Sequence, residues 1–377
     1  MKHNRRTFLR NAAATPALLA AFRTDVTAQT ADVGHGGPTL RKVPYKRIAT
    51  EEAWAPRELV ETYRKVATTK SINDPGFIAQ WARIGSKTQV IDRLSDIGER
   101  RIADMDSTGI DVQILSLTSP GVQLFDVDTA NALASSTNDQ VAEAIRKYPT
   151  RFSGLAAAAP QDPKTAAKEI ERGIRNLGLK GVIINSHTHG EFLDDPKFWD
   201  IFEASEALNV PIYLHPQTPP PAMIQPYVER AIGGAILGFG AECGLHALAL
   251  IRSGVFDRFP KLKIILGHGG EALPFWLYRI DYMNPIAWSN LRNGAEKLKR
   301  KPSEYLKDNF YITTSGMAWA PVITFLQNVL GVDRVLYAMD YPYEFEVAEV
   351  IATDNVPISK ADKKKLFQTN AERVFAL

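Results

Sequence analysis

Short apolar runs rich in β-branched residues alternate along this chain with longer stretches in which apolar residues recur every three to four positions. Runs of the first kind are typical of strands buried on both faces, and stretches of the second kind are typical of amphipathic helices. The predicted strands are 46–53, 111–117, 152–159, 181–187, 210–216, 262–268, 310–316 and 334–340. Eight strand-then-helix units predict an α/β fold, a single-domain (β/α)8 TIM barrel.

An open, doubly wound parallel sheet is the alternative fold. No glycine-rich phosphate-binding fingerprint follows an early predicted strand, so the barrel is favoured. Two connections are long, 54–110 after the first strand and 217–240 after the fifth. Connections at the carboxyl ends of barrel strands usually shape the substrate pocket. The second connection is apolar and rich in proline, so it is a candidate wall for an aromatic ligand, or a surface that packs on a neighbouring subunit.

Four predicted strands end in ionisable residues: Glu51 in IATEEAW, His215 in PIYLHP, His268 in IILGHGGE and Asp340 in VLYAMDYP. The carboxyl ends of the strands of a parallel barrel open onto one face, where the active site lies. Two imidazoles and two carboxylates that meet there predict a divalent-metal site with a proton-transfer group beside it. Consecutive strand residues point to opposite sides, so only one of Glu51 and Glu52 faces the barrel mouth.

The other histidines carry a weaker signal. His187 and His189 form a His-x-His pair after the fourth predicted strand, but this spacing alone does not establish a metal site. His246 lies in a helical pattern and is interpreted as a packed residue.

The amino-terminal residues predict export. Residues 1–28 contain the basic segment MKHNRRTFLR and then a short Ala/Leu stretch, which resembles a twin-arginine signal peptide. An amphipathic helix that stays on the protein is the alternative. We expect a linker at 29–45, the barrel at 46–377, a periplasmic location and no membrane span.

Composition narrows the class of protein. Hydrophobic residues make up 45% of the chain, which is enough for a sizeable core. The formal net charge is +3 and no basic stripe alternates with aromatic residues, so a nucleic-acid partner is excluded. The single cysteine, Cys243, excludes an intramolecular disulfide and a Cys-rich metal site.

Several segments together resemble one enzyme family. They are ATEEAWA, VQILSLTSPGVQ, PIYLHP, SGVFDRFPKLKIILGHGGE, YITTSG, AMDYPYE and the closing NAERVFAL. They resemble the amidohydrolase superfamily, in the branch of aminocarboxymuconate-semialdehyde decarboxylase and the aromatic acid decarboxylases. Within this branch, the chain is most similar to the 2,3-dihydroxybenzoate and γ-resorcylate decarboxylases. The resemblance extends from Arg47 to Leu377 and implies one divalent metal ion (zinc, manganese or magnesium) and no organic cofactor.

The resemblance also implies roles for the strand-end residues. Glu51, His215 and Asp340 match metal ligands, and Asp340 also matches the catalytic proton donor. His268 and Glu271 match a proton-relay pair. The implied reaction is non-oxidative decarboxylation of an ortho-hydroxybenzoate-type acid, in which a ring carbon is protonated before carbon dioxide leaves.

Three residues match substrate contacts by the same resemblance. Arg279 in LYRID matches an arginine that reaches the substrate of a neighbouring subunit, which implies a homodimer or a homotetramer. Arg101 and Thr118 match further contacts to an aromatic acid. From the sequence alone, surface or interface ion pairing is the alternative for both arginines.

Two departures from the family pattern leave other functions open. Ala53 stands where many relatives have the histidine of Glu-x-His, which argues against a binuclear hydrolase. Gln217 stands where close decarboxylases have arginine. The alternative function is metal-dependent hydrolysis of a lactone, ester or amide by a metal-activated water. A barrel that binds ligand without turnover is a third class.

Overall fold

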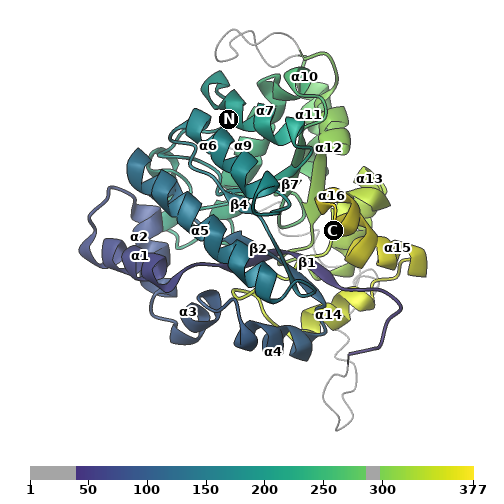
Figure 1. Ribbon diagram of the computed structural model, residues 1–377. Helices are drawn as coiled ribbons and strands as arrows, with labels where there is room; N and C mark the ends of the chain where they lie inside the picture. Colours follow the sequence, from purple (N-terminus) through teal and green to yellow (C-terminus); the bar gives the residue numbers. More distant parts are fainter. Residues whose placement is uncertain (1–39, 286–297) are drawn as a thin grey trace, which may run out of the picture. The chain divides into compact units, whose positions relative to one another are not determined.

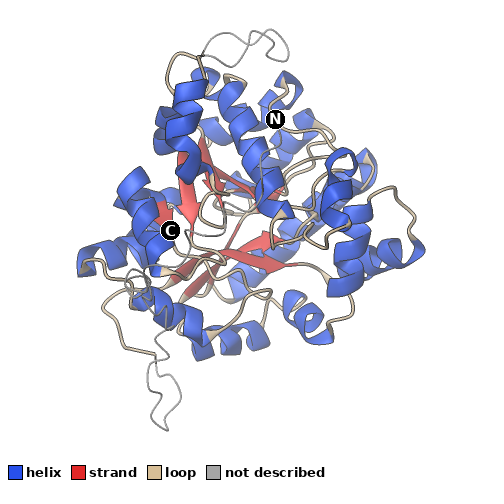
Figure 2. Cartoon of the chain, turned by 180° about the vertical axis from the view of Figure 1, so that it is seen from behind, coloured by secondary structure: helices blue, strands red, loops and turns tan. Residues whose placement is uncertain are grey.

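Parallel strands form the centre of the fold and helices surround them (Figure 1, Figure 2). The computed structural model describes residues 40–285 and 298–377. Leu40–Leu377 form one compact unit. The predicted signal peptide and the linker as far as residue 39 lie outside the described residues. No helix in the described ranges has the length and apolar character needed to cross a membrane.

The strands are β1 (Ile48–Trp54), β2 (Val112–Leu117), β3 (Phe152–Gly154), β4 (Ala156–Ala157), β5 (Val182–Ile184), β6 (Pro211–Leu214), β7 (Lys263–Leu266), β8 (Phe310–Thr313) and β9 (Val335–Leu336). They pair in two parallel sheets, in the orders β1-β2-β3 and β4-β5-β6-β7-β8-β9. Every residue of β6 and β8 is buried, as expected for strands covered on both faces.

Backbone hydrogen bonds join the two sheets into a ring. The Leu155 amide donates to Leu115 O at 2.9 Å, so β3 and β4 are two halves of one strand interrupted at this residue. The Thr50 amide donates to Tyr337 O at 3.1 Å, which joins β1 to the chain just after β9. The ring therefore has eight strand positions, and each predicted strand overlaps an observed one. The predicted α/β fold with parallel strands is confirmed, and the open-sheet alternative was wrong.

The helices of the first half are α1 (Arg57–Thr69), α2 (Pro75–Ile84), α3 (Thr88–Leu94), α4 (Glu99–Thr108), η1 (Gly121–Leu124), α5 (Val127–Lys147), α6 (Pro163–Arg175), η2 (Pro196–Phe198) and α7 (Trp199–Ala207). Those of the second half are α8 (Pro221–Val228), α9 (Gly238–Arg252), α10 (Val255–Arg258), α11 (Leu273–Met283), α12 (Pro302–Asn309), α13 (Ala320–Leu330), η4 (Val332–Arg334), α14 (Val347–Asp354), α15 (Lys360–Lys364), the π-helical turn η5 (Lys365–Thr369) and α16 (Asn370–Phe375).

Local sequence explains where the outer helices start and which side they bury. Asp162 caps α6 by accepting from the Thr165 amide, and Pro163 takes the first helical position, where no amide proton is needed. Ala166 and Ile170, four residues apart, lie on the buried side of α6. This pattern is the helical period that the sequence predicted.

The two long connections meet beside the barrel mouth. The first contains α1 to α4 and the second contains α8. They approach so closely that a Cβ atom on Gly76 of α2 would lie 2.8 Å from Thr218 and 3.1 Å from Ile224 of α8. A glycine is needed at this crossing because a larger residue has no space. The two connections therefore pack against each other at this crossing.

Candidate active site

A bulge in β1 sets the direction of Glu51. The pairing of β1 with β2 is in register up to Ala49 and again from Glu52, with an irregularity between them. Bulges redirect side chains and recur beside active sites. Glu51 lies in the irregularity, whereas Glu52 accepts hydrogen bonds from Gln113 Nε2 at 3.2 Å and from the Met339 amide at 3.1 Å. Only one of the two consecutive glutamates therefore faces the strand-end histidines.

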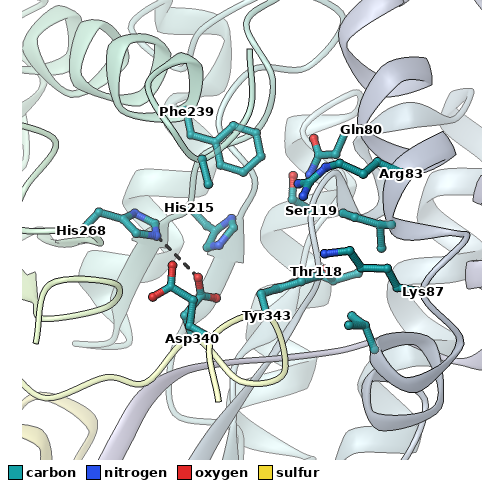
Figure 3. A pocket seen from close by; sticks show the side chains of 14 residues that line it. Gln80, Arg83, Lys87, Thr118, Ser119, His215, Phe239, His268, Asp340 and Tyr343 are labelled. Atoms are coloured by element: carbon teal, nitrogen blue, oxygen red, sulfur yellow. Dashed lines mark hydrogen bonds and ion pairs between the residues drawn. The ribbon is translucent and has the colours of Figure 1, made fainter. Parts of the chain in front are cut away.

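The four strand-end residues come together around one point. One ligand atom each of Glu51, His215 and Asp340 lies within 4.8 Å of the others. Glu51 Oε1 lies 3.3 Å from His215 Nε2 and 3.6 Å from His268 Nε2. His268 Nε2 lies 3.9 Å from Asp340 Oδ2, the ion pair drawn as a dashed line in Figure 3. Residues far apart in the sequence thus form one cluster, because parallel strands end at the same side of the barrel.

The donor set suits a divalent metal ion. Glu51 Oε1 and His215 Nδ1 are buried and have no hydrogen-bond partner in the described part of the chain. A buried carboxylate oxygen without a donor is costly unless a cation neutralises it. Burial lowers the pKa of His215 to about 4, which keeps the imidazole neutral and able to bind a metal. Two carboxylates and one imidazole accept zinc, manganese or magnesium.

Asp340 combines a metal-ligand position with a carboxyl group that can hold a proton. Burial raises its pKa to about 7, while the hydrogen bond from His268 acts in the opposite direction. The backbone of Asp340 has a φ of 65°, in the left-handed region that residues other than glycine rarely adopt. Backbone strain of this kind is concentrated at functional sites.

His268 and Glu271 form a hydrogen-bonded pair beside Asp340. His268 Nδ1 lies 2.8 Å from Glu271 Oε1. Burial disfavours the charged imidazole, but the negative charges of Glu51 and Glu271 outweigh burial and raise the pKa of His268 well above its usual value. Burial also raises the pKa of Glu271. The pair is therefore positioned to exchange protons with the aspartate.

A cavity of about 230 Å³ borders this cluster. Figure 3 shows His215, His268 and Asp340 on one side of it and the cations Arg83 and Lys87 across from them. Neither cation makes an ion pair with any residue in the described ranges. The cavity thus has a metal-binding side and a positively charged side, an arrangement suited to an anionic ligand.

Other parts of the lining come from the long connections and the strand ends. Thr118, directly after β2, lines the cavity, and its Oγ1 lies 2.6 Å from the hydroxyl of Tyr343. Phe239, from the predicted apolar connection, lies above the histidines in Figure 3. An aromatic wall and a hydroxyl group in the lining fit a flat ring that carries polar substituents.

The two arginines that the resemblance matches to substrate contacts lie in different environments. Arg101 is fully buried and donates to Ala53 O at 2.7 Å and to Asp96 O at 2.8 Å, and its guanidinium packs 4.4 Å from the ring centre of Tyr341. It is not among the residues that line the cavity, in contrast to the predicted substrate contact. Arg279 is exposed on α11 and makes no hydrogen bond or ion pair within the described residues.

Gln217 lies behind the cavity wall. Its amide donates to Asn185 O at 2.6 Å and to His187 O at 2.5 Å, which braces the loop after β5. Gln217 is buried and does not line the cavity beside the metal ligands. The replacement of the decarboxylases' arginine by glutamine therefore lies outside that cavity.

The remaining histidines also lie apart from the cluster of possible metal ligands, Glu51, His215 and Asp340. His187 Nε2 lies 3.1 Å from Thr218 O, and His246 is fully buried against Ser186. His189 is exposed. Among the described residues, the group of possible metal ligands contains none of these three.

Sequence reasoning missed two groups of residues at the site. Arg83 is exposed on α2 and Lys87 is exposed directly before α3, where cations usually indicate only a solvated surface. Tyr213 and Thr313 both donate hydrogen bonds to Glu51 but lie within apolar runs, a pattern typical of ordinary core residues. For the second group a signal existed, because Tyr213 precedes His215 by two positions and so shares its side of the strand.

Comparison with known proteins identifies the family. The amidohydrolase family model matches residues 86–377. The chain belongs to the amidohydrolase family. The resemblance noted from the sequence is thereby confirmed. This amidohydrolase is 38% identical over 341 residues to γ-resorcylate decarboxylase of Polaromonas sp., covering 88% of this chain and 98% of the relative.

Solved structures of two relatives have closely similar folds. The 5-carboxyvanillate decarboxylase of Novosphingobium aromaticivorans, with bound manganese and 3-methoxy-4-hydroxy-5-nitrobenzoic acid, is 50% identical with a TM-score of 0.86, covering 89% of this chain and 98% of that one. The dihydroxybenzoic acid decarboxylase of Polaromonas sp. JS666, with manganese and 2-nitroresorcinol, is 36% identical with a TM-score of 0.77, covering 88% and 97%.

Proposed function

We propose that this amidohydrolase is a metal-dependent, non-oxidative decarboxylase of hydroxylated aromatic acids. The observation that carries the proposal is the cluster of Glu51, His215 and Asp340, in which a buried carboxylate oxygen lacks a hydrogen-bond partner, beside the His268–Glu271 pair. Relatives that cover nearly the whole chain are decarboxylases of such acids, and two of their structures hold manganese. No organic cofactor is required for this reaction.

The reaction assigns a task to each residue. Glu51, His215 and Asp340 would hold the divalent metal ion, which would supply positive charge to the acidic end of the substrate. Asp340 gives a proton to the ring carbon that bears the carboxylate, so that a C–H bond forms. The C–C bond to the carboxylate then breaks, its electrons return to the ring, and carbon dioxide leaves. His268 and Glu271 return a proton to Asp340. General acid catalysis of this kind contributes about 10²–10⁴-fold to the rate.

The finer proposal is that the substrate has a second acidic group. Arg83 and Lys87 lie across the cavity from the metal ligands and have no ion-pair partner in the described residues. A carboxylate on the far side of the ring would pair with them in a partly desolvated position. The relative with 50% identity is named for 5-carboxyvanillate, an aromatic acid with two carboxylates, which supports this substrate class.

We also propose a homo-oligomer in which α11 lies in the interface. Phe275 (72%), Trp276 (50%), Tyr278 (85%) and Tyr282 (61%) of this helix are exposed to the stated fractions of their surface. Aromatic side chains gathered on one exposed face are typical of protein interfaces. Arg279 of the same helix is free to reach a neighbouring copy.

A second hollow continues from this exposed face to the catalytic pair. It has a volume of about 430 Å³, with Leu237, Trp276 and Met317 in its lining together with His268 and Glu271. A second copy packed on α11 would therefore cover the side of the active site that is open in the single chain. A dimer or tetramer would in this way exclude water from the reaction.

Export to the periplasm stays a proposal that rests on the RRTFLR segment. Cell fractionation tests it. The full chain is expected in the periplasm, and a variant with Arg5→Lys and Arg6→Lys is expected to stay in the cytoplasm. Equal distribution of the two proteins would contradict twin-arginine export.

The function is tested with protein stripped of metal and reloaded with manganese, zinc or magnesium. The protein is incubated with hydroxybenzoates that carry one or two carboxylates and with aryl lactones and esters. Metal-dependent release of carbon dioxide, lost in Asp340→Asn, is the expected result. Cleaved esters or lactones without carbon dioxide would replace the proposal with the hydrolase alternative. Ligand binding without any product would support the third class, a barrel without turnover.

A further inference from the structure

Two hydroxyl groups hold the second carboxylate oxygen of Glu51. The Tyr213 hydroxyl donates to Oε2, and Thr313 Oγ1 donates to the same atom at 2.9 Å. The two hydroxyl oxygens lie 3.1 Å apart, so the three groups form a closed triangle. Tyr213 and Thr313 are 0% exposed and Glu51 is 2% exposed. Glu51 Oε2 is therefore fixed within the protein, while Oε1 has no hydrogen-bond partner in the described residues and faces His215 and His268.

Adjacent strands create this arrangement. Tyr213 is in β6 and Thr313 is in β8, on either side of β7 in the sheet. Gly267 follows β7, and a Cβ atom there would lie 2.9 Å from Glu51 Oε2 and 3.0 Å from Oε1. The three strands thus form a cradle, with hydroxyl donors from the outer strands and empty space at the middle one. The carboxylate of Glu51 fills that space.

Strand periodicity places the cradle directly below the metal cluster. Tyr213 and His215 are two positions apart, so their side chains point to the same side of the chain. Glu51 contacts both, with Oε2 toward the Tyr213 hydroxyl and Oε1 3.3 Å from His215 Nε2. The two oxygens of one carboxylate therefore have separate tasks, one structural and one directed at the metal.

We propose that Tyr213 and Thr313 are positioning residues that fix Glu51 as a one-oxygen metal ligand and thereby set the affinity for the metal. This inference rests on the metal centre of the proposed function. Partners that orient a metal ligand typically change metal affinity about 10- to 100-fold when they are removed. A purely structural role, in which the hydroxyls only satisfy a buried carboxylate, would change folding stability and leave metal affinity as it is.

The experiment compares two tyrosine-to-phenylalanine variants in the otherwise unchanged protein. Tyr213→Phe removes one donor to Glu51. Tyr305→Phe is the matched control, because the Tyr305 hydroxyl also donates to a carboxylate, Asp257 Oδ1 at 2.5 Å, but is not in the metal cluster. Metal-free protein is titrated with Mn²⁺, and free Mn²⁺ is measured by electron paramagnetic resonance. Thermal unfolding of each metal-free protein is measured in parallel.

Tyr213→Phe is expected to weaken Mn²⁺ binding about 10- to 100-fold, and Tyr305→Phe is expected to bind like the wild type. Equal Mn²⁺ affinity in all three proteins would overturn the inference, whatever their unfolding temperatures. If Tyr213→Phe does not fold, two variants of Thr313 test the inference instead. Thr313→Val removes the other donor and is expected to weaken binding, whereas Thr313→Ser keeps the hydroxyl and is expected to restore it. Equal affinity in this pair would also overturn the inference.

The wild-type titration separates this inference from the proposed function. The wild type could bind one Mn²⁺ per chain and release no carbon dioxide from any tested acid. That result would contradict the proposed decarboxylase function, and the variants would still decide the positioning roles of Tyr213 and Thr313. Failure of the wild type to bind Mn²⁺ would overturn both.

Discussion

Glu271 fits beside α9 because Gly240 has no side chain. A Cβ atom on Gly240 would lie 2.9 Å from Glu271 Oε2. The carboxylate cannot move aside freely, since its other oxygen is bonded to His268 Nδ1 at 2.8 Å. The geometry of the proposed proton-relay pair thus depends on a residue that has no part in the proposed chemistry.

Gly240→Ala is therefore expected to lower kcat about tenfold or more, by displacing Glu271 from His268. Folding stability is expected to stay the same or to rise by up to about 1 kcal/mol, because alanine is favoured over glycine inside a helix. Steady-state kinetics and thermal unfolding measure the two effects separately. Gly234→Ala is the control, because a Cβ atom there meets nothing within 4 Å. Equal kcat in both variants would contradict the prediction.

Arg83→Met is expected to lower kcat/KM mainly for substrates with two carboxylates. Hydrogen bonds to charged groups contribute about 1.5–3 kcal/mol, so kcat/KM for an acid with two carboxylates is expected to fall about 10- to 150-fold. For an acid with one carboxylate, the value is expected to change less than about twofold. Carbon dioxide release from both acids is the measurement. Lys65→Met, an exposed lysine on α1, is the control. An equal loss for both acids would rule out a contact specific to the second carboxylate.

Tyr278→Asp is expected to dissociate the oligomer, because it places a charge in the centre of the exposed aromatic face of α11. Sedimentation velocity is expected to give a monomer, with reduced carbon dioxide release. Val127→Asp is the matched control, since Val127 is an apolar residue that is 41% exposed at the start of a different helix. If Tyr278→Asp sediments like the wild type, the interface does not lie on this face.

Arg279→Ala tests the role of that arginine separately from assembly. It removes one exposed side chain and leaves the aromatic residues in place, so the sedimentation coefficient is expected to stay that of the wild type. Activity is expected to fall if Arg279 reaches the substrate of a neighbouring copy. Unchanged activity would limit α11 to a structural role.

Arg101→Met is expected to act on stability and not on substrate binding. The variant removes the donors of the buried Ala53 O and of the partly buried Asp96 O. The expected loss in the free energy of unfolding is about 3 kcal/mol or more. KM is expected to stay within about twofold of the wild type, because Arg101 does not line the cavity. Chemical denaturation and kinetics measure both. A higher KM with unchanged stability would instead support a substrate contact by Arg101.

The sequence predicted the strands well because their signal is local. Each apolar run must be buried on both faces, and Glu51, His215, His268 and Asp340 stand near the ends of such runs. Once a closed parallel barrel is assumed, these residues must meet. The meeting of these strand ends therefore follows from the fold, whereas the choice between Glu51 and Glu52 depends on the bulge in β1.

The parts that sequence reasoning missed depend on distant contacts. Nothing local distinguishes Arg83 on α2 from a surface arginine, because its position opposite His215 follows from how α2 packs on α8. Arg101 presents the reverse case: a charged residue in a helical pattern indicates an exposed side chain, but here backbone carbonyls satisfy it in the core. Such pairings are not visible in the periodicity of the chain.

The bulge in β1 also constrains any attempt to engineer this site. It lies between Ala49 and Glu52, and because of it the consecutive residues Glu51 and Glu52 face different parts of the protein. Deleting one residue there would restore a regular ladder and change which carboxylate faces His215. A designer who copies the metal ligands onto an idealised barrel therefore needs to copy the irregular backbone as well.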